Sequence, residues 1–192
     1  MAMPIQEQSW TAEMVRALPD DGNRYEVVDG ILLVSPSPSW PHQRAVGYLW
    51  TWLTAYLQLN RAGAAYFAPA DVEFTPRRMV EPDVFVVPLV DGRVPMHFDA
   101  VRSLLLAIEV LSPSTARSDR HIKRRLYQSE GVGEYWIVDL EARSVERWRP
   151  ADERPEILDV RIAWQPTGAP TALEIDLVRY FADVFDEAPG AG

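Results

Sequence analysis

The stretch Leu104-Leu105-Leu106-Ala107-Ile108-Glu109-Val110-Leu111 decides the fold, because it is an almost continuous apolar run of strand length. Strands with one face in water alternate between apolar and polar residues, whereas strands covered on both faces do not. The run therefore predicts a central strand that is buried on both sides. Glu109 interrupts it, and burying a carboxylate without a partner is costly. We expect Glu109 to have a cation, a hydrogen-bond network or solvent access at the strand end.

The chain continues from this strand into a second half of regular elements. After Ser112-Pro113-Ser114-Thr115 we expect a helix at residues 117–129, which Gly131 closes. Residues 134–139 predict another strand, and residues 144–148 predict its hairpin partner. This order places one helix between two strands of the same sheet.

The C-terminal part has a weaker pattern. Residues 156–162 predict one further strand, and residues 176–185 predict an amphipathic helix. The side chains expected on the buried side of this helix are Leu177, Val178, Phe181 and Phe185.

Upstream of the central strand, the pattern predicts a long helix and then extended segments. Residues 41–60 carry apolar side chains at three- and four-residue steps, and Ser39 is placed to cap the helix that this spacing predicts. Residues 65–68 and 71–74 are expected to be extended, and residues 79–87 predict the strand beside the central one.

Residues 88–103 hold Gly92 and Pro95 and have no steady period, so we expect a loop with one short helical turn. Such a loop is a candidate for determining substrate specificity.

The N-terminal part predicts a short helix and a hairpin. Residues 10–18 form the helix, with Thr11 as its N-cap. Residues 25–28 and 31–34 are rich in strand formers and are joined by Asp29-Gly30. Asp-Gly is typical of two-residue hairpin turns, because both positions need positive φ angles.

The composition fits one globular domain spanning residues 1–192. The chain has 192 residues, of which 47% are hydrophobic and 24% charged, so it can enclose a sizeable core. We expect an N-terminal helix and hairpin extension at residues 1–40, a core at residues 41–140, and C-terminal strands and a helix at residues 141–192.

The residue types also exclude several classes of site and location. The chain has no cysteine, which excludes disulfides, thiolate metal sites and cysteine nucleophiles. A metal would have to use oxygen or imidazole ligands. No apolar run approaches the roughly 18 residues needed to cross a bilayer, and no signal-peptide pattern is found. We expect a cytoplasmic protein that has no contact with a membrane.

The formal net charge of −9 argues against tight, nonspecific binding of nucleic acid through a broad basic surface. Positive charge is nevertheless concentrated at residues 117–125, which contain Arg117, Arg120, Lys123, Arg124 and Arg125. This cluster is either a basic stripe that contacts nucleic acid or an ordinary solvated helix face.

Three polar residues are expected at one end of the sheet. Asp83 lies in a strand directly after a proline, Glu109 lies near the end of the adjacent strand, and Lys123 lies in the helix that follows. Carboxylates in this arrangement can hold Mg²⁺, whose remaining coordination sites take water and a phosphate oxygen. A nearby ammonium can orient the attacking water or offset developing charge. The pattern therefore favours metal-assisted phosphodiester hydrolysis.

Ordered motifs over nearly the whole chain resemble the Uma-two family of restriction-endonuclease-like proteins. They are RYEVVDG (24–30), SPSP (35–38), HQR (42–44), VEPD (80–83), IEVLSPST (108–115), DRHIK (119–123) with Tyr127, and GVGEYWIVD (131–139). That family is similar to the PD-(D/E)XK nuclease superfamily. The resemblance implies an α/β fold with a mixed-sheet core of helix, three strands, helix and strand, the order expected from residue 41 to residue 139.

The resemblance implies a role for each of these residues. Asp83 and Glu109 would be the two acids that bind Mg²⁺, or Mn²⁺ as a substitute, and the backbone carbonyl of Val110 would be a third ligand. The residue two positions after the glutamate should be lysine, and here it is Leu111. Lys123 looks like a displaced replacement, since a long lysine stem can reach back toward the strand end.

Each assignment has a structural alternative. Lys123 could form a surface ion pair with Asp119, four residues earlier on the same helix. Glu109 could be a buried acid held by backbone or arginine partners, and Asp83 could stabilise a turn.

Further polar residues are accessory candidates. His42 could contact metal or substrate, or be an ordinary polar residue in the first turn of its helix. Glu26 and Asp71 could be additional ligands or could anchor hairpins and loops. Arg117, Arg120 and Arg124 are the candidates for contacting DNA. His97 and His121 have no ligand spacing relative to each other.

Three functional hypotheses follow. The first is a Mg²⁺-dependent endonuclease that hydrolyses DNA. The second is a nuclease-like scaffold that binds a partner without cleaving it, which the acidic net charge and the displaced lysine favour. The third, compatible with either, is a homodimer or higher homo-oligomer that associates through a sheet edge or through the aromatic hairpin around Trp136 and Trp148.

Overall fold

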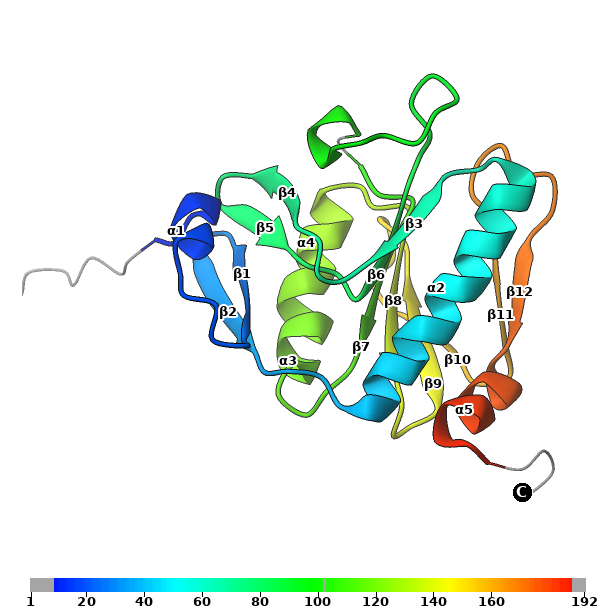
Figure 1. The fold of residues 1–192 in the computed structure, drawn as a ribbon. Coiled ribbons are helices and arrows are strands. Elements are labelled where there is room, and N and C mark those ends of the chain that lie inside the picture. Colours follow the sequence, from blue (N-terminus) through cyan, green and yellow to red (C-terminus); the bar gives the residue numbers. More distant parts are fainter. Residues whose placement is uncertain (1–8, 102, 188–192) are drawn as a thin grey trace, which may run out of the picture.

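The computed structural model describes residues 9–101 and 103–187, and its central feature is a six-stranded mixed sheet (Figure 1). The strand order is β10-β9-β8-β7-β6-β3. These strands are β3 (Ala64–Phe67), β6 (Val84–Val87), β7 (Leu106–Val110), β8 (Glu134–Asp139), β9 (Ser144–Trp148) and β10 (Glu156–Leu158). Every residue of β7 is buried. The prediction of a central strand covered on both faces is confirmed.

The connections of β7 explain how one end of the sheet becomes a site. β7 runs parallel to β8, with Val110 beside Val138, and antiparallel to β6, with Ile108 beside Val84. A parallel pair needs a crossover connection, which the helical segment between β7 and β8 supplies. The C-terminal end of β7 therefore lies beside the start of β6 and the start of that crossover.

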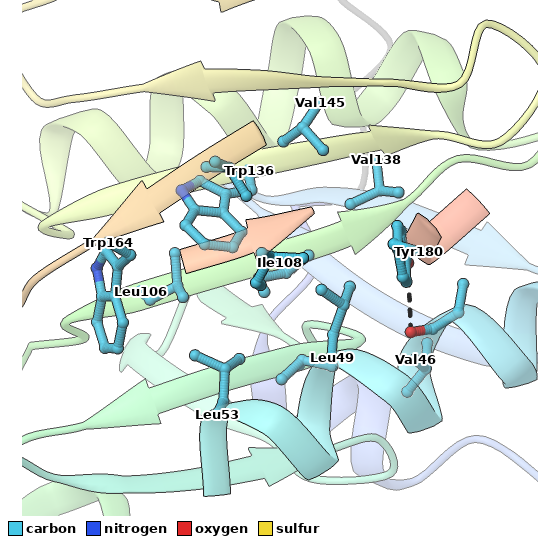
Figure 2. Close-up of a cluster of buried hydrophobic side chains, with 14 of the residues drawn as sticks. Val46, Leu49, Leu53, Leu106, Ile108, Trp136, Val138, Val145, Trp164 and Tyr180 are labelled. Atoms are coloured by element: carbon cyan, nitrogen blue, oxygen red, sulfur yellow. Dashed lines mark hydrogen bonds between the residues drawn. The ribbon is translucent and has the colours of Figure 1, made fainter. Parts of the chain in front are cut away.

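Helices α2 (Trp40–Asn60) and α5 (Leu177–Phe185) cover one face of this sheet (Figure 1). Alternate residues of β7, Leu106, Ile108 and Val110, join Leu49 and Leu53 of α2 in the core on this face (Figure 2). Ser39 caps α2 as predicted, since its side chain accepts a hydrogen bond from the backbone N–H of His42. The N-terminus of α2 lies at the same end of the sheet as the end of β7, because His42 in its first turn contacts Asp83.

The other face carries the crossover helix and a second sheet. In this four-stranded sheet the order is β2-β1-β5-β4, and the strands are β1 (Arg24–Val28), β2 (Ile31–Ser35), β4 (Val72–Thr75) and β5 (Arg78–Val80). Leu126 and Tyr127 of the crossover pack between Val28 and Val80 of this sheet and Ala107 of β7. The crossover helix lies between the two sheets (Figure 1).

The N-terminal elements follow the sequence pattern closely. Helix α1 (Ala12–Arg16) is capped by Thr11, which accepts a hydrogen bond from the N–H of Met14. β1 and β2 form the predicted hairpin, with φ angles of 52° at Asp29 and 84° at Gly30. A Cβ at Gly30 would lie 2.5 Å from Oγ of Ser9, so the turn needs glycine for space as well as for conformation.

The helix predicted at residues 117–129 is divided into three parts. It consists of α3 (Ala116–Ser118), the π-helical turn η2 (Asp119–Lys123) and α4 (Arg124–Ser129). A π-helical turn inserts one extra residue into the helix and is frequent at functional sites. Both ends of this turn, Asp119 and Lys123, are buried.

The single strand expected at residues 79–87 is wrong. β5 belongs to the four-stranded sheet and β6 to the central sheet, and Glu81-Pro82-Asp83 connects them. Pro82 has no N–H to give to a ladder and restricts the residue before it, so the strand breaks there. Asp83 lies in a bend just before β6 and not inside a strand.

Two C-terminal predictions also need correction. Residues 156–162 divide into β10, in the central sheet, and β11 (Arg161–Trp164), whose partner β12 (Leu173–Asp176) the sequence pattern did not reveal. On α5 the buried side chains are Leu177, Tyr180, Phe181 and Val184, whereas Val178 is 62% exposed and Phe185 38% exposed. The hydroxyl of Tyr180 donates a hydrogen bond to the carbonyl of Ala45, which fixes the rotation of α5 against α2 (Figure 2).

The loop after β6 contains the short helical turn that was expected, η1 (Phe98–Ala100). Trp136 and Trp148 are 1% and 8% exposed, so the aromatic hairpin lies inside the core and offers no aromatic surface for an interface between copies. No helix in residues 9–101 and 103–187 combines the length and apolar character needed to cross a membrane.

Candidate active site

A cleft of about 320 Å³ lies at the C-terminal end of β7. Two loops rich in serine and proline form its rim, residues 35–39 before α2 and residues 112–115 after β7. Asp83, Glu109 and Lys123 all line this cleft. The structure thus brings together the three residues that the sequence placed at one end of the sheet.

Asp83 lies beside Glu109 because β6 and β7 are antiparallel neighbours. Their register pairs Val84 with Ile108, so the next position along sets Asp83 opposite Glu109. The Asp83 side chain is almost fully buried and accepts three hydrogen bonds. The donors are Arg24 at 2.9 Å to Oδ1, and the N–H of Val110 at 2.8 Å and Nε2 of His42 at 3.1 Å to Oδ2.

These donors control the charge of Asp83. Burial alone would raise the pKa of its carboxyl, but the hydrogen bond and charge of His42, the charge of Arg24 and the Val110 N–H together lower the pKa to about 2. The Asp83 carboxylate is therefore ionised throughout the physiological pH range.

Glu109 has a different environment although it lies next to Asp83. It is 2% exposed, and its Oε1 accepts hydrogen bonds from Nζ of Lys123 and from the hydroxyl of Tyr127, each at 3.0 Å. Burial raises the pKa of Glu109 well above its usual value, despite the attraction of Lys123. The nearby carboxylates of Asp119, Asp83 and Glu26 raise it further. An ionised Glu109 is therefore costly unless a further cation is present.

Lys123 occupies the end of the π-helical turn, and only 2% of the residue is exposed. Its Nζ lies 2.6 Å from Oε2 of Glu26, 3.0 Å from Oε1 of Glu109 and 3.5 Å from Oδ1 of Asp119. The alternative of an ion pair with Asp119 is confirmed at 3.5 Å, but its expected position on the surface is wrong, because both side chains are buried. Burial opposes the charged form of Lys123, but these carboxylates outweigh it and raise its pKa well above the usual value.

Buried carboxyl groups outnumber the cations around the cleft. The carboxylates of Glu26, Asp83, Glu109 and Asp119 are buried, and the cations that face them are Arg24 and Lys123. A protonated His42 would still leave more anions than cations. Oδ1 of Asp119 is buried and accepts no hydrogen bond from the described residues. Such a cluster favours the binding of a further cation.

The two acids have acceptor positions left for a metal ion. A carboxylate offers about four such positions. Asp83 uses three, and Glu109 uses two, both on Oε1. In the described part of the chain, no three histidine, cysteine, aspartate or glutamate side chains are grouped so that they could hold one ion. The free acceptor positions of these two carboxylates are the kind of ligand that Mg²⁺ uses, since it keeps several waters and binds through one or two protein carboxylates.

The accessory candidates divide into two groups. His42 and Glu26 are both buried beside the site. His42 contacts the carboxylate of Asp83, and Glu26 contacts the ammonium of Lys123. Asp71 is absent from the cleft lining and forms a partly exposed ion pair with Arg16 at 3.5 Å. Asp71 is therefore better explained as a residue that anchors its loop to α1.

The three candidate DNA-binding arginines also differ. Arg120 contacts Asp139 at 2.8 Å and Glu146 at 2.6 Å, while Arg124 stacks on Trp148 and donates a hydrogen bond to Gln128. Both are occupied by contacts within the chain. Arg117 is exposed and lines a neighbouring hollow that shares Ser114 with the cleft. Of the three, Arg117 is best placed to meet a ligand.

The loop after β6 was expected to contribute to specificity, and its position argues against this. β6 starts beside the cleft at Asp83 and ends at Val87. The loop leaves from that far end of the strand (Figure 1). The rim of the cleft is formed instead by the two serine-proline loops.

The sequence reasoning assigned no role to Arg24 or Tyr127. Arg24 bonds Asp83, and Tyr127 bonds Glu109. The signal that could have revealed Arg24 is its spacing from Glu26, because two charged residues two positions apart in a strand lie on one face. For Tyr127, the signal is its position one helical turn after Lys123.

Comparisons with known proteins agree with this architecture. The Uma2 family, described as a putative restriction endonuclease, matches residues 12–177. A crystal structure of a putative nuclease belonging to DUF820, from Anabaena variabilis ATCC 29413, superposes with a TM-score of 0.74. The two sequences are 20% identical, and the match covers 91% of this chain and 98% of that chain. At this identity the superposition establishes the fold. No curated protein matches the sequence.

Proposed function

This chain belongs to the Uma2 family of putative restriction endonucleases, and we propose that it is a Mg²⁺-dependent endonuclease that hydrolyses DNA phosphodiester bonds. One observation carries the proposal. Asp83, just before β6, and Glu109, on the neighbouring strand β7, line one cleft with Lys123, and buried carboxyl groups outnumber the cations there. A PD-(D/E)XK site needs this set of residues, and the surplus of carboxyl groups gives a physical reason for a divalent cation to bind.

The residues divide the chemistry between them. Asp83 and Glu109, with the carbonyl of Val110, would hold Mg²⁺, which supplies charge neutralisation at the phosphate and an activated water. Lys123 places a permanent positive charge against Glu109, where it can orient the attacking water and offset charge on the phosphate. His42 and Arg24 keep Asp83 ionised and fix its orientation.

Contacts to the DNA backbone would come from the rim of the cleft. Ser37, Ser112 and Ser114 carry hydroxyl groups there, and Arg117 supplies positive charge in the adjoining hollow. Hydroxyls and arginines at such positions bind phosphate oxygens and position the strand without reading its sequence.

A metal titration tests the proposed ligands. Mg²⁺ or Mn²⁺ should raise the thermal stability of the wild type, by about 3 kcal/mol at a hundredfold excess over Kd. Asp83→Asn and Glu109→Gln should lose this effect. Asp71→Asn is the matched control, because Asp71 lies outside the cleft and should respond like the wild type. Equal metal responses in all four proteins would exclude the two-acid site.

A cleavage assay separates an enzyme from a scaffold. Plasmid and single-stranded DNA should be cut in the presence of Mg²⁺, and Lys123→Ala should abolish the cutting. The scaffold alternative is favoured by the fact that three carboxylates already lie within 3.5 Å of the Lys123 ammonium, and one of them, Glu109, accepts a hydrogen bond from it. Metal binding by the wild type without any cleavage would support the scaffold.

Association between copies is a separate proposal. The edge strands β3 and β10 of the central sheet remain available in the described chain for a homodimer or higher oligomer. Light scattering on the purified protein decides this point. A monomer across the accessible concentration range would exclude the association.

A further inference from the structure

The N-terminal hairpin delivers side chains to the active site because β1 alternates between two faces. Tyr25 and Val27 pack against α1 on one face. Arg24 and Glu26 belong to the other face, where Val28 joins the core beneath the crossover helix. Successive residues of a strand point to opposite sides, so Arg24 and Glu26 lie on the same face of β1, where Arg24 lines the cleft and Glu26 is buried against Lys123.

Each of these two residues contacts one residue of the proposed active site. Arg24 donates a hydrogen bond to Oδ1 of Asp83 at 2.9 Å, and Oε2 of Glu26 lies 2.6 Å from Nζ of Lys123. They also hold the backbone that leads to Asp83. Arg24 donates to the carbonyl of Glu81 at 2.7 Å, and Oε1 of Glu26 accepts the N–H of Glu81 at 2.8 Å.

Of the three carboxylates around Lys123, Glu26 is the closest to its ammonium group. Glu109 is farther away at 3.0 Å, and Asp119 is farther still at 3.5 Å. Although close, Oε2 of Glu26 makes no hydrogen bond with favourable geometry in the described structure, so its contact with Lys123 is electrostatic. Glu26 therefore attracts the ammonium electrostatically, while Glu109 accepts its hydrogen bond.

A purely stabilising role does not explain this arrangement. Replacing a buried ion pair with apolar residues is often neutral or stabilising, so a buried pair is weak evidence for a contribution to stability. Glu26 instead adds negative charge to a cluster that already has too much of it. The arrangement makes sense if the position of the Lys123 ammonium matters for function.

We propose that Glu26 is a positioning residue of the active site, which sets the position of the Lys123 ammonium and leaves Glu109 available to a cation. This inference rests on the proposed nuclease function. The N-terminal sheet would then contribute to the active site, because Arg24 of β1 binds Asp83 and Glu26 of β1 lies against the ammonium of Lys123.

Glu26→Gln tests the proposal, because it removes the charge and keeps the shape. Lys123 should move onto Glu109, and kcat for DNA cleavage at saturating Mg²⁺ should fall about 10- to 100-fold, as is usual when a residue that orients an active-site group is lost. KM for DNA should stay unchanged, since Glu26 is buried and makes no contact with solvent. Glu26→Asp, which keeps the charge, should recover part of the lost rate.

The matched control is Glu73→Gln. Glu73 lies on β4 of the same sheet and pairs with Arg16 at 2.7 Å, but it does not line the cleft. This variant should cleave like the wild type. Equal kcat for Glu26→Gln and Glu73→Gln would overturn the proposal.

A double variant distinguishes positioning from general stabilisation. If Glu26 acts through Lys123, then Glu26→Gln should weaken Mg²⁺ binding in the wild-type background and should leave the Mg²⁺ affinity unchanged in a Lys123→Met background. The same loss of Mg²⁺ affinity in both backgrounds would overturn the proposal.

A measurement without catalysis keeps the test independent of the nuclease function. The ¹⁵N and ¹H resonances of the Lys123 ammonium, in metal-free protein, should shift in Glu26→Gln and stay in place in Glu73→Gln. Unchanged Lys123 resonances in Glu26→Gln would overturn the positioning role even if the wild type cleaves DNA. Absence of cleavage by the wild type would instead overturn the nuclease function alone. If Glu26→Gln does not fold, Glu26→Asp replaces it, because the shorter side chain withdraws the carboxylate from Lys123 and should shift the same resonances by a smaller amount, and unchanged resonances there would overturn the positioning role.

Discussion

The Asp83 side and the Glu109 side of the cleft are adjacent, yet their surroundings shift the pKa of the two carboxyl groups in opposite directions. Asp83 receives donors from three different elements, and its pKa is lowered to about 2. Glu109 shares its lysine with two other carboxylates, and burial raises its pKa well above the usual value. Both residues are almost completely buried, so burial alone does not explain the difference.

The difference lies in the balance between burial and its neighbours: at Asp83 the hydrogen-bond donors and positive charges outweigh burial, whereas at Glu109 burial and nearby carboxylates outweigh them. The Asp83 carboxylate can bind a cation without first losing a proton, because its ionised form is already stabilised. The ionised form of Glu109 is not stabilised in the metal-free protein, so a bound cation would be needed to stabilise it. Two acids whose environments separate their pKa values are a common sign of divided roles in an active site. Four measurements test this contrast, from the largest expected effect to the smallest.

Lys123→Met should have the largest effect on stability. It removes the positive charge shared by Glu26, Glu109 and Asp119, and breaking a buried ion pair in this way costs about 3–5 kcal/mol. Urea unfolding measures the change. Arg161→Met is the control, since the exposed pair of Arg161 with Glu174 should contribute less than about 1 kcal/mol. Similar losses in both variants would contradict the buried cluster.

The dependence of the unfolding free energy on pH in the acid range tests the lowered pKa of Asp83. The pKa of Asp83 in the folded protein, about 2, lies below the usual 3.8, so folding favours the ionised form. Its stabilisation is complete above pH 3.8 and is lost as the pH falls toward 2, which amounts to about 2 kcal/mol. The difference in unfolding free energy between wild type and Asp83→Asn should shrink over this range. A difference that does not depend on pH would contradict the lowered pKa.

Glu109→Gln should make the metal-free protein more stable at pH 8, because the variant has no acid to ionise at this buried position. The raised pKa of Glu109 means that folding favours its neutral form. The contribution of the acid is complete below the usual 4.5 and is lost as the pH rises, so the advantage of the variant should grow with pH. Thermal unfolding with a chelator present measures it. A less stable variant at pH 8 would show that Glu109 is satisfied without a metal.

Arg117→Ala should have the smallest effect, because Arg117 lies outside both sides of the cleft. It should weaken DNA binding uniformly across sequences and reduce the salt dependence by about one phosphate contact. Fluorescence anisotropy at several salt concentrations measures both effects. The stabilisation by Mg²⁺ should stay as in the wild type, and a loss of it would place Arg117 inside the metal site.

Most elements could be predicted from local patterns. The apolar run around Ile108, the spacing in α2 and the Asp29-Gly30 turn each satisfy a rule that involves neighbouring residues only. The errors arose where distant contacts decide. The strand break at Pro82 separates two sheets, and β12 is a strand only because β11 pairs with it. The rotation of α5 is set by the hydrogen bond from its Tyr180 to the carbonyl of Ala45 on α2.

The sequence by itself determined the central strand, the crossover and the meeting of Asp83, Glu109 and Lys123, since strand order and a short crossover leave few alternatives. Only the tertiary structure decided how those groups are charged. Arg24 and Glu26 reach the site from a separate sheet, 59 and 97 positions before Asp83 and Lys123 respectively. The pKa of a buried group depends on every charge within a few ångströms, and that set of neighbours is a property of the folded chain alone.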